Sequence, residues 1–133
     1  MKNALILLLF VAPLCAQQDN AIYFARTSAE TIISKCSAVN RVDISANSLP
    51  VSKDVSDLLF CYGYIDGISD SASILKAINP SAAFLFCLPN QSQQSQLAKV
   101  IVNYGNAHPE EWHYGGVWIS IAAFNHAFPC IAN

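Results

Sequence analysis

Residues 52–78 read SKDVSDLLFCYGYIDGISDSASILKAI, a stretch in which apolar side chains recur at helical spacing. Ser52 is a favourable N-cap, and the aspartates that follow it suit the positive end of a helix dipole. Asn79-Pro80 ends the pattern, because proline disfavours helical backbone at the residue before it. The stretch therefore predicts one long helix.

One stripe of this helix is expected to face the core, and its members are Leu58, Tyr62, Ile65, Ala72 and Leu75. Gly63 and Gly67 lie four residues apart and stack on one face, where missing side chains would let another helix come close. Each glycine costs about 1 kcal/mol of helix propensity relative to alanine. Close packing is expected to return more than that cost.

Three further helices are expected around this one, separated by segments rich in chain-breaking residues. Residues 37–50 mix serine, asparagine, aspartate and proline without a period, which is typical of a loop. The expected helices are 21–36 with Asp19 or Asn20 as the cap, 92–106 with Ser92 as the cap, and 109–128 with Pro109 in the first helical position. No long stretch alternates as a strand would, so the predicted fold class is all-α, a small bundle of about four helices.

The N-terminus has the features of an export signal. Met1 and Lys2 precede the apolar run 4–11, which is too short to span a bilayer, and the small residue Ala16 follows. Residues 1–16 are therefore expected to form a signal peptide, cleaved near Ala16. Residues 17–133 would then form a single all-α domain with no membrane attachment.

The composition of the chain limits the kinds of partner that this domain is expected to bind. The chain of 133 residues is 53% hydrophobic and only 12% charged, with a formal net charge of −2. Nucleic-acid binding depends on a surplus of positive charge. A nucleic-acid partner is therefore not expected.

Four cysteines remain after the predicted cleavage: Cys36, Cys61, Cys87 and Cys130. They form no CxxC motif and have no histidine at zinc-ligand spacing, so two disulfides are expected in an exported protein. An antiparallel pair of the last two helices would bring Cys87 to Cys130. Cys36 ends the first helix and Cys61 lies early in the second, with a loop between them that can fold back. The bundle is thus expected to be stapled by these two bridges.

The most enzyme-like segment is His108-Pro-Glu-Glu-Trp-His113. Its two histidines are five residues apart and diverge by roughly 140° around a helix, unlike the one-turn spacing of a zinc motif. His126 could meet Cys87 or Cys130 as a nucleophilic pair, but disulfide formation competes with that role. No catalytic, metal or cofactor site is therefore expected.

Two other groups have structural interpretations. Asp66 and Asp70 lie one turn apart and are expected to form a solvated face. Trp112, Tyr114 and Trp118 are expected to belong to the core or to an interface rather than to a cage that binds a ligand.

A series of short motifs follows one order along the chain: Ile32-Ile33-x-x-Cys36, Cys61-Tyr-Gly-Tyr-Ile-Asp-Gly-Ile-x-Asp70, Phe86-Cys-Leu-Pro89, Gln96-Leu-x-x-Val100 with Tyr104, His108-Pro-Glu110 with His113, and Ala127-Phe-Pro-Cys130. Together they cover nearly all of residues 17–133. In content and order they resemble the Tai/Rap family of immunity proteins, the periplasmic antidotes to type VI secretion amidases. The chain departs from that pattern at Gly105 and at Gly115-Gly116, where glycine is expected to loosen the last two helices by about 1 kcal/mol per residue.

The resemblance implies an all-helical, often dimeric protein in the periplasm of a Gram-negative bacterium. It also implies that the protein binds a papain-like peptidoglycan amidase and blocks its active-site cleft. A homodimer through helical faces is expected, and the separation of Trp112 and Trp118 by six residues agrees with it, since both cannot point into one narrow stripe. The alternatives are a cell-envelope enzyme that uses His113 or His126, or a helical envelope adaptor.

Contact with an amidase is expected from loops rather than from the motif residues, because loops on a rigid scaffold most readily enter a concave cleft. Two loops qualify, residues 40–53 and residues 79–91. The second is favoured because a disulfide at Cys87 would tether it. The candidate contact residues are Arg41, Asp43, Asn79, Ser81, Asn90 and Gln91.

Overall fold

The computed structural model describes residues 27–43, 45, 51–79 and 86–130. Within them the chain forms four α-helices and two short 3-10 helices, and no strand, which confirms the all-α fold class. The predicted signal peptide, the predicted cap at Asp19 or Asn20, and Ser81 lie outside the described residues. The elements are α1 (Ala29–Cys36), η1 (Ser37–Asn40), α2 (Lys53–Ile78), α3 (Gln94–Ala107), η2 (Pro109–Glu111) and α4 (Gly116–Ala127).

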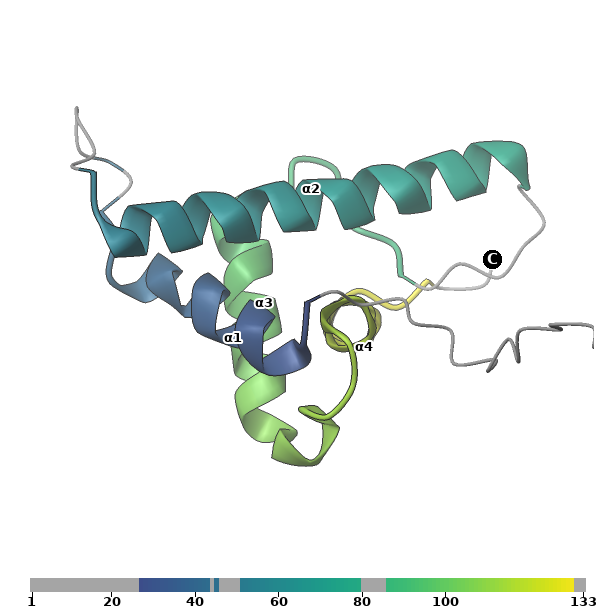
Figure 1. Ribbon diagram of the computed structural model, residues 1–133. Coiled ribbons are helices and arrows are strands. Elements are labelled where there is room, and N and C mark those ends of the chain that lie inside the picture. The colour runs from purple at the N-terminus through teal and green to yellow at the C-terminus, as the bar shows by residue number, and fades with distance from the viewer. Residues whose placement is uncertain (1–26, 44, 46–50, 80–85, 131–133) are drawn as a thin grey trace, which may run out of the picture.

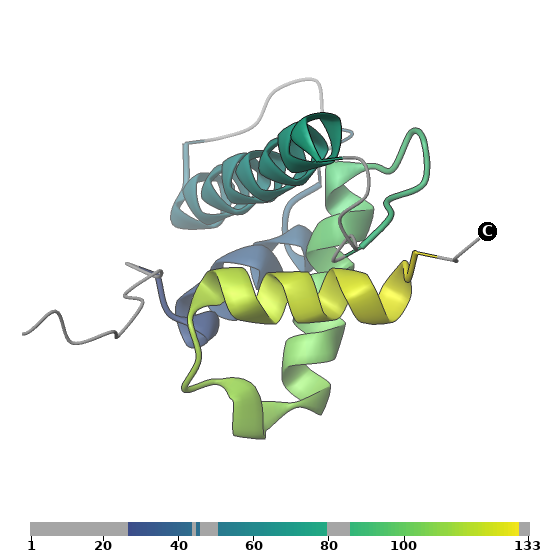
Figure 2. The ribbon, with the colours of Figure 1, turned by 90° about the vertical axis from the view of Figure 1, so that its right-hand side faces the viewer.

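Helix α2 dominates the arrangement. It has the predicted N-cap, because the Ser52 hydroxyl accepts a hydrogen bond of 3.2 Å from the N–H of Val55, and it ends at Ile78 as expected. Its 26 residues span about 39 Å. Helix α1 lies along its N-terminal half, α3 crosses beneath it, and the C-terminal part extends beyond both (Figure 1). Figure 2 shows α4 lying across α3.

The core lies where α1, α2, α3 and α4 meet. Its fully buried side chains include Ile32, Leu58, Ile65, Ile101 and Phe124. The prediction of which α2 residues face the core is therefore correct at Leu58 and Ile65, while Tyr62 and Ala72 are partly buried. It is wrong at Leu75, whose side chain is 60% exposed because it belongs to the part of α2 that extends past the other helices.

Both predicted disulfides are present. Cys36 and Cys61 are bonded across α1 and α2 and are fully buried, with their Cα atoms 5.0 Å apart. Cys87 and Cys130 join the segment before α3 to the segment after α4. A hydrogen bond of 2.9 Å from the Cys87 N–H to the Phe128 carbonyl reinforces this second connection. The two bridges thus tie the first helix to the second, and the start of α3 to the end of α4.

An ion-pair cluster adds to the contact between α1 and α2. The Asp57 side chain is 7% exposed and accepts a 2.8 Å hydrogen bond from the Lys35 ammonium group and another from Lys53. These two cations hold the pKa of Asp57 below its ordinary value. The carboxylate therefore remains charged although it is buried.

Two helix starts and the segment that follows α1 differ from the sequence expectation. Helix α1 begins at Ala29, not near residue 21, because Ser28 is extended and caps it by accepting from the Thr31 N–H at 3.2 Å. The N-cap of α3 is Gln93, while the Ser92 hydroxyl donates to the Pro89 carbonyl at 2.8 Å. The predicted loop after α1 also begins with the 3-10 helix η1.

The last predicted helix is divided. Pro109 begins η2, and α4 starts only at Gly116. Between them the chain makes tertiary hydrogen bonds that a continuous helix could not offer: the Ala29 N–H donates to the Tyr114 carbonyl at 3.1 Å, and the Gly116 N–H donates to the Thr27 carbonyl at 2.8 Å. Contact with the segment before α1 therefore separates η2 from α4.

The glycines have roles different from those expected. A Cβ at Gly63 or Gly67 would meet nothing within 4 Å, so none of the described helices approaches there. A Cβ at Gly105 would collide with Ile33, and one at Gly116 would lie 2.6 Å from Ile32 Cγ1 and 2.9 Å from Tyr64 Oη. The expectation that Gly105 and Gly116 loosen the helices considered propensity alone and is wrong for packing. These glycines let α1 approach α3 and α4 closely.

The contrast between the crowded Gly116 and the open Gly67 predicts that a change to alanine has opposite effects on stability at the two positions. Gly116→Ala should lower the free energy of unfolding by about 1–3 kcal/mol, because the added methyl group overpacks the site against Ile32 and Tyr64. Gly67→Ala, the matched control on the face of α2 that no described helix covers, should raise the free energy of unfolding of the monomer by about 0.5–1 kcal/mol through helix propensity. Chemical denaturation of both variants measures the difference. Equal stabilisation by the two changes would contradict the close approach at Gly116.

The disulfides should differ in their resistance to reduction. Cys87 is exposed, whereas Cys36 and Cys61 are inaccessible in the core. A mild thiol reductant should therefore open Cys87–Cys130 in the folded protein and leave Cys36–Cys61 closed until the protein unfolds. Alkylation at successive times followed by peptide mapping reports the order. Labelling of Cys36 and Cys61 at the same rate as Cys87 would refute this expectation.

Candidate functional site

The first predicted contact residue, Arg41, is already paired within the chain. It lies at the end of η1, and its guanidinium donates to Asp54 at 2.9 and 3.1 Å and to the Ser37 carbonyl at 3.2 Å. The hydrogen bond to Asp54 raises the pKa of Arg41 and lowers that of the carboxyl group. The side chain is 48% exposed. It joins the end of η1 to the start of α2, and part of it is left accessible.

Asp43 organises a local turn beside it. Its carboxylate accepts hydrogen bonds from the Ser45 hydroxyl at 2.6 Å and the Ser45 N–H at 3.0 Å, and these lower the pKa of Asp43. The residue is exposed. Arg41 and Asp43 therefore present a fixed pair of opposite charges near the N-terminal end of α2.

Asn90 and Gln91 form the tip of a tight turn. The Ser92 N–H donates to the Pro89 carbonyl at 3.3 Å, and Gln91 has a φ of 68°. This is the left-handed region, which the third residue of such a turn requires and which favours glycine. Both side chains at the tip are exposed. The turn is therefore a protruding segment with a defined backbone.

The surroundings hold this turn in place from both sides. The Cys87–Cys130 bridge precedes it, and the Gln94 amide after it donates to the Asp66 carboxylate at 2.6 Å. Asp66 thus has a structural partner, while Asp70 is exposed, as the solvated-face interpretation expected.

The predicted contact residues do not form one surface. Asn79 is the exposed C-cap of α2. Arg41 is hydrogen-bonded to Asp54 at the opposite end of the same helix, which is about 39 Å long. Gln94, which follows the turn at Asn90 and Gln91, contacts Asp66 in the middle of α2, so the turn lies near the middle of that helix. The candidate contact residues are therefore spread along the whole length of α2.

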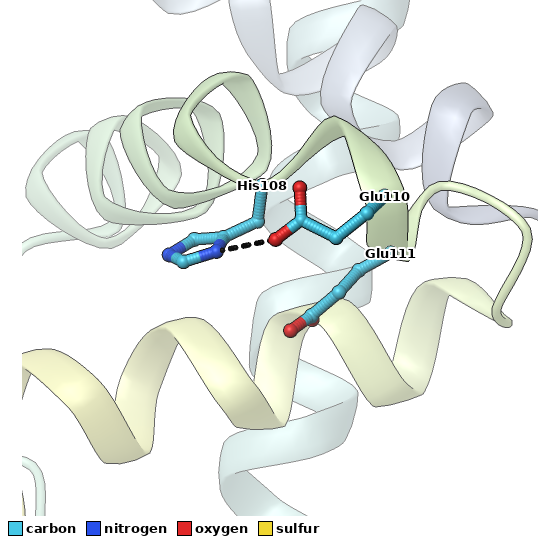
Figure 3. Close-up of side chains that lie close together, drawn as sticks. All are labelled: His108, Glu110 and Glu111. Carbon is cyan, nitrogen blue, oxygen red and sulfur yellow. Dashed lines mark hydrogen bonds and ion pairs between the residues drawn. The ribbon is translucent and has the colours of Figure 1, made fainter.

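The histidines of the segment 108–113 are not brought together. His108 Nδ1 lies 3.1 Å from Glu110 Oε1, whereas the ring of His113 lies tilted against that of Tyr114, with centroids 4.0 Å apart. Figure 3 shows His108, Glu110 and Glu111 converging at the junction of α3 and η2. The pKa of Glu110 is lowered by its own backbone N–H and by the His108 hydrogen bond. The cluster thus joins one histidine to two carboxylates.

The cysteine and histidine pair considered from the sequence does not exist. Cys87 and Cys130 are bonded to each other, so neither offers a thiolate. The ring of His126 instead lies beside that of Tyr104, with centroids 5.7 Å apart. The expected structural role of these cysteines is confirmed.

Trp112, Tyr114 and Trp118 are exposed and do not belong to the core. Trp118 is 59% exposed and packs against Tyr114 with ring centroids 5.7 Å apart. Trp112 is partly fixed, because its indole N–H donates to the Gly105 carbonyl at 2.7 Å. These residues form an aromatic surface beside the start of α4.

The sequence interpretation missed a second apolar surface on α2. Phe60, Ile74 and Ile78 are 43%, 58% and 75% exposed, and at about 100° per residue they lie on the face that carries Gly63 and Gly67. We call these five residues the α2 stripe. Their helical spacing could have revealed the face, but only the tertiary contacts show that the core uses a different one.

The fold and its surfaces define a class: a small all-helical protein, stapled by two disulfides, whose exposed apolar faces and turn suit binding to other proteins. The family model of the Rap1a immunity proteins matches residues 28–130. The chain therefore belongs to the Rap1a immunity protein family, which confirms the resemblance seen in its motifs. No curated protein and no solved structure matches the chain significantly.

Membership of this family bears on chemistry and compartment. Immunity proteins are generally not enzymes. The two disulfides, together with the family, indicate a protein that folds outside the reducing cytoplasm. Among the described helices, none has both the length and the apolar character needed to cross a membrane.

Proposed function

We propose that this protein is a periplasmic immunity protein that neutralises a peptidoglycan amidase delivered by a type VI secretion system. The family match over residues 28–130 carries the proposal. The export signal expected in residues 1–16 and the disulfides of a predicted domain at 17–133 agree with a periplasmic location. Inhibition would follow from occupation of the amidase cleft rather than from catalysis.

The turn at Asn90 and Gln91 is the best candidate for insertion into that cleft. Its side chains are exposed, and a disulfide and the Gln94–Asp66 hydrogen bond hold its base. A segment that is ordered before binding loses little conformational entropy in the complex. The left-handed backbone of Gln91 supports this choice, since strained positions cluster at functional sites. The second candidate is the charged pair Arg41 and Asp43.

Inhibition can be tested by titrating the purified protein into the amidase encoded beside its gene and measuring muropeptide release from peptidoglycan. The proposal predicts stoichiometric loss of release. Asn90→Lys with Gln91→Lys should weaken inhibition without changing the melting temperature, because both side chains are exposed. Arg41→Glu with Asp43→Lys is the comparison pair, and it should have the smaller effect because these side chains have partners within the chain.

Other outcomes would favour other functions. Release of muropeptides by this protein alone would indicate an envelope enzyme. An intact amidase activity at excess protein would indicate an adaptor or another target. Full inhibition by both double variants, with loss of inhibition on changing an exposed helix face, would remove the loops as the contact.

We also propose a homodimer formed through the α2 stripe. Gly63 and Gly67 leave open space on α2 that no described part of the chain fills, and exposed Phe60, Ile74 and Ile78 lie on the same face. Two copies of this face could approach closely at the glycines and bury the flanking apolar side chains. The aromatic surface at Trp118 is the competing dimer interface.

Light scattering during size-exclusion chromatography tests the dimer. The unchanged protein should have a dimer mass at micromolar concentration, and Gly67→Arg should have a monomer mass because the long side chain blocks the close approach. Trp118→Ala is the matched control on the other surface and should remain dimeric. A monomeric unchanged protein would remove the proposal, and dissociation by Trp118→Ala alone would move the interface to α4.

A further inference from the structure

A cluster of metal-ligand side chains lies at the junction of α3 and η2. His108, Glu110 and Glu111 each offer one ligand atom, and these atoms lie within 4.8 Å of one another. It is the one group of three such residues among the parts of the chain that the structure describes. Imidazole nitrogen and carboxylate oxygen are both ordinary ligands of Zn²⁺.

One oxygen of this cluster lacks a partner. Glu111 Oε1 accepts a hydrogen bond of 3.1 Å from the Tyr104 hydroxyl, but Oε2 is buried and has no hydrogen-bond partner within the described residues. A buried carboxylate oxygen without a donor carries a desolvation cost that nothing repays. A cation bound beside it would remove that cost.

The ligand side chains are also oriented by their neighbours. Tyr104 holds Glu111 through its hydroxyl and packs its ring against that of His108, with centroids 4.3 Å apart. Such contacts to ligand residues set ring orientation and metal affinity in known sites. His108 Nδ1 and Glu110 Oε1 lie 3.1 Å apart. Two ligands of a tetrahedral zinc ion are separated by a similar distance, about 3.3 Å for bonds of about 2.0 Å.

We propose that His108, Glu110 and Glu111 bind one divalent transition-metal ion of the Zn²⁺ type. The imidazole and one oxygen of each carboxylate are the protein ligands, and Glu111 Oε2 gains its missing partner. His108 and Glu110 are 36% and 68% exposed, so the remaining coordination positions face solvent. Sequence spacing argued against a site built on His108 and His113, whereas the proposed site combines His108 with its neighbours on η2.

Isothermal titration of Zn²⁺ into the untagged, oxidised mature protein tests the site. One ion should bind per chain. Glu111→Gln retains an acceptor for Tyr104 but loses the charge, and it should weaken binding by at least about a hundredfold, since loss of an outer partner alone costs about 10–100-fold. Glu110→Gln changes a side chain that is largely exposed, so it should lose affinity while the fold is unchanged.

His113→Ala is the matched control, because it removes an exposed histidine of the same segment that lies outside the cluster. It should bind Zn²⁺ like the unchanged protein. Absence of binding to the unchanged protein would overturn the proposal. The proposal would also be overturned if the Glu110→Gln and Glu111→Gln variants bound Zn²⁺ as tightly as the unchanged protein, or if His113→Ala lost binding. This outcome is independent of the amidase assay.

Discussion

The contact between α1 and α2 at the buried Cys36–Cys61 bridge is the constraint on which the rest of the fold depends. The bridge brings the end of a short helix against the first half of a long one, and Asp57 joins the same two helices through Lys35. An eight-residue helix is too short to be stable by itself in water. Its persistence therefore depends on tertiary contacts of this kind, and the bridge contributes about 2–4 kcal/mol.

With α1 held on α2, the other helices close around it. Gly105 lets α3 approach Ile33, and Gly116 lets α4 approach Ile32. The backbone segment before α1 then pairs with the one before α4 through Ala29 and Gly116. Helix α1 is thus the centre of the core, although it is the shortest α-helix among the described residues. A buried apolar face compensates for its small number of internal hydrogen bonds.

The same arrangement leaves specific parts available for interaction. The C-terminal part of α2 extends beyond the core beneath it, which exposes Ile74 and Ile78 of the α2 stripe. At Gly63 and Gly67 no described part of the chain approaches the same face. The second disulfide anchors the segment before the turn at Asn90 and Gln91, and η2, which follows α3, has no buried residue. A compact helical core therefore supports several exposed surfaces whose positions are rigid.

The sequence by itself determined the all-α class, the Ser52 cap and end of α2, and both disulfide pairs. Helix periodicity, capping and chain breaking act within a few residues, so they can be seen in a local stretch. Only the tertiary structure decided the break between η2 and α4, the exposure of Leu75, and the roles of the glycines. Each depends on a distant segment: Ala29 bonding to Tyr114, the limited extent of the core beneath α2, and Ile32 lying against Gly116. Residues 108–113 also showed metal-ligand residue types in the sequence, but the sequence interpretation placed them at the start of one continuous helix. His108 meets Glu110 and Glu111 because the structure instead forms the 3-10 turn η2, closed by a hydrogen bond from the Glu111 N–H to the His108 carbonyl, before α4 begins.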